Sequence, residues 1–395
     1  MKPRVLIVCN ALDEGTRHQR GITTDSPAAS RKIFMLCQSL RLVGVRPCVV
    51  SLGRGAAGGS RQYFRAVLRR VDRVPVYYLP FSKIPLLSEL ITLLAPLGIV
   101  FQLWRRNYSS VVFYNRMPAY IAALLMSSLL GFRAILDLED GELITGRSGL
   151  AASFGRLVCR LFDRLCRGGA LLACSALATM TTARPVLSYY GVAPGGSVTR
   201  NPESEHVTVL MGGTLCRETG SDLVIETIRQ LRQSGSAWAQ RLRFEVTGKG
   251  SGMADFQRLA QEPGYPEVIV HGRTTDLQYR EVLERSDVGL ALKLNTGALA
   301  NSTFPSKVIE FAAAGLLVLT TDISDVRMVL GETGALYLTR DEPRMLLGLF
   351  ESIVRDRMKA HACAQRGTQN VQLLCAPRAS GQRVADFIFG PEREK

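Results

Sequence analysis

Residues 302–319 read Ser-Thr-Phe-Pro-Ser-Lys-Val-Ile-Glu-Phe-Ala-Ala-Ala-Gly-Leu-Leu-Val-Leu and combine a helix start with a buried strand. Proline suits the first turn of a helix, because the N–H that it lacks would have no partner there in any case. The sequence therefore predicts a helix over residues 305–315. Ser306 and Lys307 would lie beside the free amides of its first turn, and a helix N-terminus with an adjacent lysine is suited to bind phosphate.

Glu310 would lie one turn further along this helix, on the face that Ser306 also occupies. Its carboxylate could accept hydrogen bonds from the two vicinal hydroxyls of a ribose while the helix start holds the attached phosphates. The motif thus favours a nucleoside diphosphate site. The alternative is an ordinary helix that begins with proline and carries a solvated lysine and glutamate.

The residues around this motif repeat strand, turn and helix at intervals of about 25–40 residues. This order resembles the C-terminal half of GT-B glycosyltransferases, especially the large retaining family that uses nucleotide-sugar donors. The resemblance covers most of residues 200–340 and is weaker over residues 4–201. It implies an α/β chain of two Rossmann-like, doubly wound domains that face each other across a cleft. The strands that carry it are expected at residues 208–213, 244–248, 268–272, 286–292 and 316–320.

The first half of the chain alternates strand and helix patterns in the same way, which predicts a parallel sheet. We expect an acceptor-binding, membrane-facing domain at residues 1–200 and a nucleotide-sugar-binding domain at 201–375. The segment 376–395 is expected to be a helix that crosses back to the first domain, as the last helix does in GT-B enzymes. Strands are predicted at residues 4–9, 48–52, 74–79, 111–114, 134–138 and 171–174, and helices at 30–43, 119–130 and 149–167.

Ligands of open parallel sheets bind beyond the carboxyl ends of the strands, so the donor-binding residues are expected in the loops that follow them. Two departures from the family's pattern accompany these residues. Ser302 occupies the place of a sugar-contacting glutamate, and Thr214 and Thr219 replace a diphosphate-binding arginine and lysine. The donor-binding residues that the motifs and the resemblance imply are Gly213, Thr214, Arg217, Gly248, Lys249, Gly250, Ser302, Ser306, Lys307 and Glu310.

Charge compensation for the diphosphate must then come from other basic residues, for which Arg217, Lys249, Lys307 and Arg17 are the candidates. The changes resemble divergent members of the family that build bacterial surface polysaccharides, in which a Pro-Ser-Lys helix start is frequent. They leave the donor sugar and the stereochemical outcome open.

An acidic cluster follows the predicted strand at residues 134–138. The first 200 residues hold ten acidic side chains, and four of them, including Glu139, Asp140 and Glu142, lie within six positions. In relatives the equivalent strand ends in a catalytic His-Asp or similar pair, and Glu139 stands at the histidine position. Glu139 or Asp140 is therefore the candidate general base, its pKa raised by partial burial. The alternatives are a solvated acidic turn, a helix cap, or a retaining reaction that needs no base.

Charge is unevenly distributed along the 395 residues. Residues 1–200 hold 26 Lys and Arg against 10 Asp and Glu, a net +16, whereas residues 201–395 hold 23 against 24. Such asymmetry is typical of contact with an anionic surface. Nucleic acid is not expected, because zinc-finger spacing and aromatic RNA-binding strands are absent from the sequence. An anionic membrane surface is the expected partner.

Residues 84–104 support the membrane interpretation, because Glu89 is their only charge and basic residues flank them. Length would allow a transmembrane helix, but Pro96 weakens a continuous helix and a charge at membrane depth is costly. The segment also separates two apparent strands of one sheet, which a single crossing would place on opposite sides of the bilayer. We predict one or two partly exposed helices that dip into the interface with Trp104 at headgroup level. Plain core packing and a true span are the alternatives.

The nine cysteines form no Cys-x-x-Cys pair, and the four histidines have no neighbouring ligands at metal-site spacing. These patterns favour reduced thiols in the cytosol, no metal and no cofactor besides the donor, which we expect to be a UDP-sugar. The first strand is too short for the apolar region of a signal peptide. The protein is therefore expected to be cytoplasmic and peripheral on the cytoplasmic face of the inner membrane.

The sequence thus predicts a glycosyltransferase, with a hexose the favoured sugar, that extends a lipid-linked or polysaccharide acceptor in the synthesis of exopolysaccharide, capsule or lipopolysaccharide. Two other classes compete with it. A Gly-x-Gly-x-Gly turn at residues 248–252 suggests a nicotinamide oxidoreductase, but its third glycine comes one position early and no acidic residue follows at the usual distance. A noncatalytic nucleotide-sugar-binding protein is the other alternative, because Ser302, Thr214 and Thr219 replace family residues.

Overall fold

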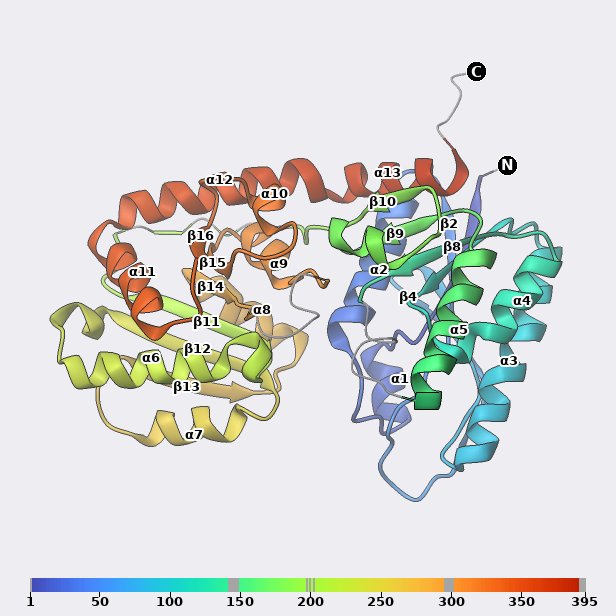
Figure 1. Cartoon of the computed structure of the whole chain (residues 1–395). Helices are drawn as coiled ribbons and strands as arrows, with labels where there is room; N and C mark the ends of the chain where they lie inside the picture. The colour runs from blue at the N-terminus through green and yellow to red at the C-terminus, as the bar shows by residue number, and fades with distance from the viewer. Residues whose placement is uncertain are drawn as a thin grey trace. The chain divides into compact units, whose positions relative to one another are not determined.

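The computed structural model describes residues 2–140, 149–196, 198, 200–201, 203–294 and 302–390. They form two compact units, Met1–Val192 with Pro377–Lys395 and Ala193–Ala376 (Figure 1). Each unit is built on its own twisted sheet, and each is described by itself below.

The first unit is built on an eight-stranded sheet in the order β10-β9-β8-β7-β1-β2-β5-β4. Its central strand β1 reads Arg-Val-Leu-Ile-Val-Cys and is buried from Val5 to Cys9, as expected for a parallel strand covered on both faces. The parallel sheet predicted from the sequence is confirmed. The strands are β1 (Arg4–Cys9), β2 (Arg46–Ser51), β4 (Val67–Val71), β5 (Val74–Tyr78), β7 (Ser110–Tyr114), β8 (Arg133–Leu138), β9 (Ala170–Leu172) and β10 (Val186–Ser188).

The prediction of parallel strands alone was incomplete. Strand β4 pairs antiparallel with β5, and a short antiparallel pair joins β3 (Tyr63–Phe64) to β6 (Phe81–Ser82). Asp72 and Arg73 form the β4–β5 turn with φ of 48° and 65°. Positive φ at both central residues is the geometry of a two-residue hairpin turn. Because neither residue is glycine or asparagine, the turn has no strong sequence signal.

Helices cover this sheet, and the C-terminal helix α13 (Pro377–Phe389) packs along α2 (Pro27–Leu42). Gly381 allows this packing, since a Cβ there would overlap the Ser39 carbonyl. Ser26 caps α2 by accepting a hydrogen bond from the Ala29 amide. The other helical segments of the unit are α1 (Glu14–Gln19), α3 (Pro85–Arg105), η1 (Pro118–Tyr120), α4 (Ile121–Leu129), α5 (Gly149–Leu165) and η2 (Ser175–Met180).

Helix α3 refines one expectation and confirms another. It is one continuous helix, although Pro96 lies inside it. An interior proline removes one backbone hydrogen bond and can kink a helix without ending it. Strands β5 and β7, which precede and follow α3, lie in the same sheet, as the sequence predicted. Among the described residues α3 is the one helix long and apolar enough to cross a membrane, and 28% of its most apolar window is buried.

The second unit has a six-stranded parallel sheet in the order β13-β12-β11-β14-β15-β16. In order of sequence this is 3-2-1-4-5-6, the Rossmann arrangement. Helices pack on both faces, and Phe244 of β12 meets Phe350 of α11 edge to face with ring centroids 5.4 Å apart. The strands are β11 (Val207–Thr214), β12 (Leu242–Lys249), β13 (Glu267–Gly272), β14 (Val288–Ala291), β15 (Leu317–Thr321) and β16 (Leu336–Leu338).

The helical segments of this unit alternate with its strands, and the helix predicted over residues 305–315 is shorter at both ends, since α9 runs from Lys307 to Ala313. Helix α9 begins at Lys307 rather than at Pro305, and Ser306 is its N-cap residue. The helical segments are η3 (Arg217–Thr219), α6 (Ser221–Ser234), η4 (Ala237–Arg241), α7 (Met253–Gln261), α8 (Asp276–Arg285), α9 (Lys307–Ala313), α10 (Val326–Leu330), α11 (Pro343–Arg355) and α12 (Arg357–Cys375).

Candidate functional site

The strand order of the second unit reverses between β11 and β14, and ligands of open α/β sheets bind at such a point, beyond the carboxyl ends of the strands. The loop after β11 and the segment that leads into α9 both start at this edge. Most of the donor-binding residues that the sequence predicts come from this edge of the sheet.

Lys307 is the centre of the polar contacts at this edge. Its ammonium donates to the Glu310 carboxylate at 2.7 Å and to the Tyr279 hydroxyl of α8 at 2.7 Å. The ammonium also lies 4.5 Å from the centre of the Tyr279 ring, a cation–π distance. Burial disfavours the charged form, but Glu310 and Tyr279 outweigh it and raise the pKa of Lys307 above its ordinary value. Lys307 therefore stays protonated and positively charged beside the Glu310 carboxylate.

Two turns that contain glycine, at Gly213 and Gly248, place backbone without side chains next to Lys307. A Cβ at Gly213 would lie 3.4 Å from Cε of Lys307. Gly248, with φ +126°, passes so close to Gly213 that a Cβ would overlap the Gly213 carbonyl. Only glycine fits there, because both the positive φ and the close approach exclude a side chain. The ends of β11 and β12 thus bring bare backbone close to the lysine.

The remaining predicted donor residues differ in their exposure and in whether they contact the two glycine turns or Lys307. Thr214 and Lys249 are register partners at the ends of β11 and β12 and are both exposed. The Thr219 hydroxyl donates to the Thr214 carbonyl at 2.7 Å, so it braces the loop. Arg217 is exposed, and Ser302 is buried with 3% of its surface accessible. Direct contacts and close approaches join Gly213, Gly248, Lys307 and Glu310 of the predicted set, while Gly250 approaches Leu215 and Ser306 precedes α9.

Tyr279 is the residue of this site that the sequence did not predict. Besides its contact with Lys307, its ring lies 3.5 Å from the position of a Cβ on Gly212. It belongs to a helix with an ordinary capping box, Thr275 with Gln278, and the surrounding sequence has no motif that marks a ligand. Only the three-dimensional structure, which brings Tyr279 of α8 into contact with Lys307 of α9, shows that its hydroxyl and ring belong to the site.

In the first unit, the acidic turn after β8 is held by Asn115 at the end of β7. The Asn115 side chain accepts from the Glu139 amide at 3.0 Å and donates to the Asp140 carboxylate at 3.4 Å. Its own amide donates to the Asp137 carbonyl at 2.7 Å, and its φ is +63°. Glu139 and Asp140 therefore have fixed backbone positions. Glu142, the remaining member of the predicted cluster, lies outside the described residues.

Lys32 of α2 lies between two carboxylates of this turn. Its ammonium donates to Oε1 of Glu139 and lies 3.8 Å from Oδ1 of Asp137. The side chains are mostly buried, with 13% of Lys32, 18% of Glu139 and none of Asp137 exposed. Burial disfavours the charged lysine, but the two carboxylates outweigh it and raise the pKa of Lys32.

Asp137, which is not one of the two catalytic candidates, is a carboxylate of this turn whose pKa is raised. Burial raises the pKa of Asp137 to about 7, the nearby Lys32 lowers it in part, and the Glu139 charge raises it. Neither carboxylate oxygen has a hydrogen-bond partner within the described structure. Sequence reasoning grouped Asp137 with its neighbours, because alternation along β8 does not show which acidic side chain points inward.

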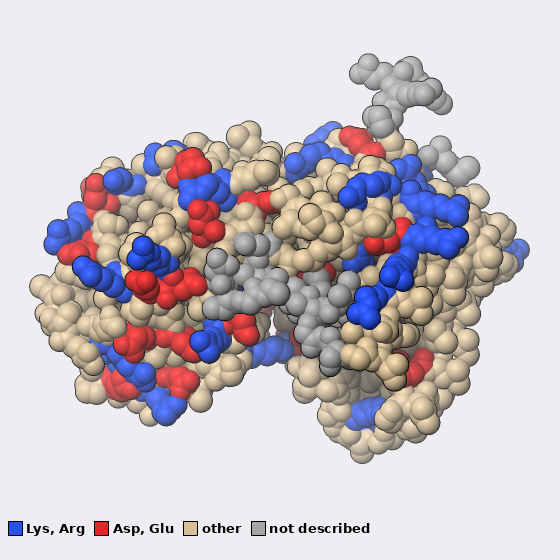
Figure 2. All heavy atoms as spheres, viewed as in Figure 1, with Lys and Arg blue, Asp and Glu red and all other residues tan. Residues whose placement is uncertain are grey.

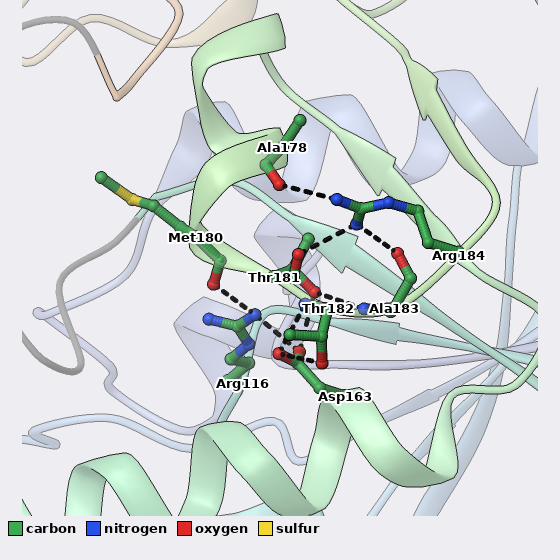
Figure 3. A network of polar contacts seen from close by, with 8 residues as sticks. All are labelled: Arg116, Asp163, Ala178, Met180, Thr181, Thr182, Ala183 and Arg184. Carbon is green, nitrogen blue, oxygen red and sulfur yellow. Dashed lines mark hydrogen bonds and ion pairs between the residues drawn. The ribbon is translucent and has the colours of Figure 1, made fainter.

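Arg116, the next residue after Asn115, anchors this loop to α5 and to the segment after η2 (Figure 3). It donates to Asp163 Oδ1 at 2.7 Å and to the Met180 carbonyl at 2.9 Å. Asp163 also accepts from the Thr181 hydroxyl at 2.8 Å and from the Thr182 amide at 2.9 Å. This partly buried network holds the backbone from which Asn115 reaches the acidic turn.

The part of the chain that the structure describes shows no candidate metal site. These residues contain no group of three or more His, Cys, Asp or Glu side chains able to hold a metal ion. Metal independence stays a prediction.

Comparison with known proteins agrees with this geometry. Residues 206–356 match the sequence model of the glycosyl transferases group 1 family. No curated protein matches the chain. Among solved structures, HepE of Anabaena, crystallised with UDP and glucose, is 14% identical with a TM-score of 0.66, and the match covers 98% of each chain.

Two further structures match over nearly the whole length. Sucrose-phosphate synthase of Thermosynechococcus elongatus is 12% identical with a TM-score of 0.65, covering 97% of this chain and 98% of that one. The UDP-forming α,α-trehalose-phosphate synthase of Burkholderia vietnamiensis is 11% identical with a TM-score of 0.62, covering 98% and 99%.

The chain has the GT-B fold of these structures. Its residues 206–356, which contain the Lys307 site, match a glycosyl transferases group 1 domain, and this match supports a glycosyltransferase.

Proposed function

We propose that this glycosyltransferase moves a sugar, most simply a hexose, from a UDP-sugar to a lipid-linked saccharide at the cytoplasmic face of a bacterial inner membrane. The product would be a precursor of exopolysaccharide, capsule or lipopolysaccharide. The observation that carries the donor part is the arrangement of Lys307 and Glu310 beside the glycine turns at Gly213 and Gly248.

The chemistry of this arrangement suits a nucleoside diphosphate. Bare backbone at the two turns allows close approach of phosphate oxygens, and Lys307 supplies a cation. Lys307 and Glu310 are paired with each other. On donor binding, the diphosphate would replace Glu310 as the partner of the Lys307 ammonium, and the ribose hydroxyls would donate hydrogen bonds to the Glu310 carboxylate. The presence of UDP and glucose in the HepE crystals supports the same donor class.

Thermal unfolding of the purified protein separates the proposed function from its rivals. UDP should raise the midpoint of unfolding in a concentration-dependent way, because a ligand that binds only the folded state stabilises it. NAD should leave the midpoint unchanged. The reverse pattern would identify a nicotinamide enzyme. Binding of UDP-sugars without any transfer or slow hydrolysis would point instead to a noncatalytic binding protein.

The acceptor part of the proposal rests on the exposed apolar surface of the first unit. Helix α3 packs on α4, and α4 packs on α5. Each of the three helices exposes large apolar side chains, among them Leu86 at 87%, Leu129 at 85% and Leu150 at 91%. Large exposed apolar side chains gathered on neighbouring helices support a protein or membrane contact. The exposed members on and next to α3 are Ile84, Leu86, Leu87, Leu90, Leu93, Leu94, Phe101 and Trp104.

Basic residues border these apolar side chains, which favours an anionic lipid surface over a protein partner. On α5, Arg156, Arg160 and Arg164 recur every fourth residue and therefore share one face, next to the face of Leu150 and Leu157. Figure 2 shows a row of basic side chains in the region of α5. Glu89, the acidic residue of α3, is paired with an arginine, Arg54, at 3.2 Å. An amphipathic surface with a basic border is typical of interfacial binding.

Membrane binding should have two components. The first is electrostatic and should disappear in high salt, because each basic residue near an anionic surface contributes about 1 kcal/mol and the screening length is about 8 Å at physiological salt. The second comes from apolar burial and should persist in salt but disappear when Leu93, Leu94 and Trp104 are changed to polar residues. Sedimentation with vesicles of varying anionic content measures both components.

The matched control changes exposed apolar residues of the second unit instead. Met328, Met358 and Leu373 are 65%, 66% and 77% exposed, and polar replacements there should leave vesicle binding unchanged. Protein that stays in the supernatant with acidic vesicles at low salt would refute the membrane proposal.

A further inference from the structure

We propose that Arg200 is a positioning residue of the donor site, because it joins the carboxyl ends of α8 and α9, the two helices that carry Tyr279 and Lys307. The proposal deepens the proposed function and rests on Lys307 being part of the nucleotide site. Arg200 would act at a distance from the nucleotide. It would hold the two helices at the spacing at which the Lys307 ammonium meets the Tyr279 hydroxyl.

The Arg200 guanidinium donates hydrogen bonds to backbone carbonyls of both helices. Its Nη2 donates to the Leu283 carbonyl at 3.0 Å and to the Ala314 carbonyl at 3.1 Å, and its Nη1 donates to the Glu284 carbonyl. Leu283 and Glu284 belong to the last turn of α8, and Ala314 is the C-cap residue of α9. The last carbonyls of a helix lack partners within the helix and carry partial negative charge, so a cation suits them. One side chain therefore bridges two helix ends.

The backbone just before Arg200 lies against the same end of α9. The Val198 amide donates to the Ala314 carbonyl at 3.3 Å. Gly315 has φ of +84°, and a Cβ there would lie 2.8 Å from the Val198 carbonyl oxygen, so this close approach favours glycine. Arg200 therefore starts from a backbone held at the end of α9, and its side chain reaches α8 from there.

The bridge matters because the two helices pack on different strands. Helix α8 packs on β11, whereas α9 packs on β14 and β15. Arg200 joins them at their carboxyl ends, and the hydrogen bond from Lys307 to Tyr279 joins them near their amino ends. A tilt or slide of one helix against the other would separate Tyr279 from Lys307. A bridge at one end of the pair therefore restrains the contact at the other end.

Helix α8 has a further anchor, which holds it to the sheet. Arg285 donates to both oxygens of the Glu245 carboxylate of β12, at 2.6 Å and 2.5 Å, and His271 of β13 lies 2.6 Å from the same carboxylate. This cluster holds α8 against β12 and β13. Arg200 differs from it in joining α8 directly to α9.

Coupling between Arg200 and Tyr279 distinguishes positioning from a purely stabilising role. Tyr279→Phe alone should weaken UDP binding roughly fivefold, through the loss of one hydrogen bond. Arg200→Met should weaken it by a similar factor, because the hydroxyl no longer meets the ammonium. Adding Tyr279→Phe to Arg200→Met should then cost less than about twofold, since the contact is already lost. An arginine that only stabilises the fold would leave the UDP affinity unchanged and the effect of Tyr279→Phe undiminished. Calorimetry with UDP measures all three variants.

Arg232 provides the matched control. It is another partly buried arginine of the second unit, and it donates to the Leu259 carbonyl at 2.8 Å and to the Pro266 carbonyl at 3.1 Å. Its Nε, like that of Arg200, has no hydrogen-bond partner within the described structure. Neither of its carbonyl partners belongs to α8 or α9. Arg232→Met should therefore lower the midpoint of thermal unfolding, as Arg200→Met does, and leave the UDP affinity unchanged.

Fluorine NMR follows the contact without any nucleotide. In the full-length protein labelled with 3-fluorotyrosine, the Tyr279 signal is assigned by its loss in Tyr279→Phe, and its shift in Lys307→Met marks the loss of the contact. Arg200→Met should move this signal in the same direction, and Arg232→Met should leave it in place. An unmoved Tyr279 signal in Arg200→Met would overturn the proposal.

The two measurements also separate this inference from the function on which it rests. A Tyr279 signal that moves in Arg200→Met while the UDP affinity does not change would support the bridge and overturn the proposed donor site at Lys307. If Arg200→Met does not fold, as circular dichroism would reveal, Arg200→Lys decides, because lysine keeps the charge but lacks the planar fork that reaches both helices. A displaced Tyr279 signal in that variant supports the bridge, and an unmoved signal refutes it.

Discussion

Replacing the correct member of the acidic turn by its amide, in Glu139→Gln or Asp140→Asn, should lower turnover by roughly a hundredfold or more. The amide cannot accept the proton of the acceptor hydroxyl, whereas it keeps nearly the same shape. Donor affinity should stay close to that of the unchanged protein, because the two residues belong to the first unit and the proposed donor site to the second. Steady-state kinetics with the acceptor and calorimetry with UDP measure the two quantities.

The matched control for this pair is Glu226→Gln, on the exposed face of α6, which should behave like the unchanged protein. The structure favours Glu139 over Asp140 as the more sensitive position, since the Lys32 ammonium donates a hydrogen bond to its carboxylate and so fixes its orientation. NMR of the product decides the mechanism independently. A product that keeps the anomeric configuration of the donor would remove the base assignment, because retention by front-face attack relies on the leaving diphosphate.

Weaker nucleotide binding is the second large effect, expected from Lys307→Ala and from Glu310→Ala separately. Each should reduce the affinity for UDP by about 1.5–3 kcal/mol, the range of charge-assisted hydrogen bonds, which corresponds to roughly 10–150-fold. Removing one partner also leaves the other charge uncompensated, so the two effects should not add in the double variant. Calorimetry with UDP is the measurement.

Tyr279→Phe provides a graded comparison for the same site. It keeps the ring that lies 4.5 Å from the ammonium and removes the hydroxyl that accepts its hydrogen bond. Its effect should be smaller than that of either charge removal, about 1 kcal/mol. Lys359→Ala, on α12, should have no effect. Unchanged UDP affinity in both Lys307→Ala and Glu310→Ala would return α9 to an ordinary helix with a lysine and a glutamate.

Much of the fold follows from local sequence. Strands such as β1 and β11 are buried on both faces, so they read as short, nearly continuous apolar runs bounded by turn residues. The helix after Pro305 and the close-approach glycine at 248 have local causes as well, which is why both were predicted. Features without a local sequence signal were not predicted. The β4–β5 hairpin with its Asp72–Arg73 turn is an example.

The sequence by itself therefore determined the parallel strands of the two sheets, the strand ends from which the loops with the candidate site residues start, and the acidic turn after β8. Only the tertiary structure decided how side chains pair across those loops. Lys32 and Glu139 are 107 positions apart, and Lys307 and Tyr279 are 28 apart. Periodicity records which face of an element is buried but not which residue of another element it meets. Partner choice, and with it the charge state of each catalytic or binding candidate, is fixed only when the helices and strands are packed together.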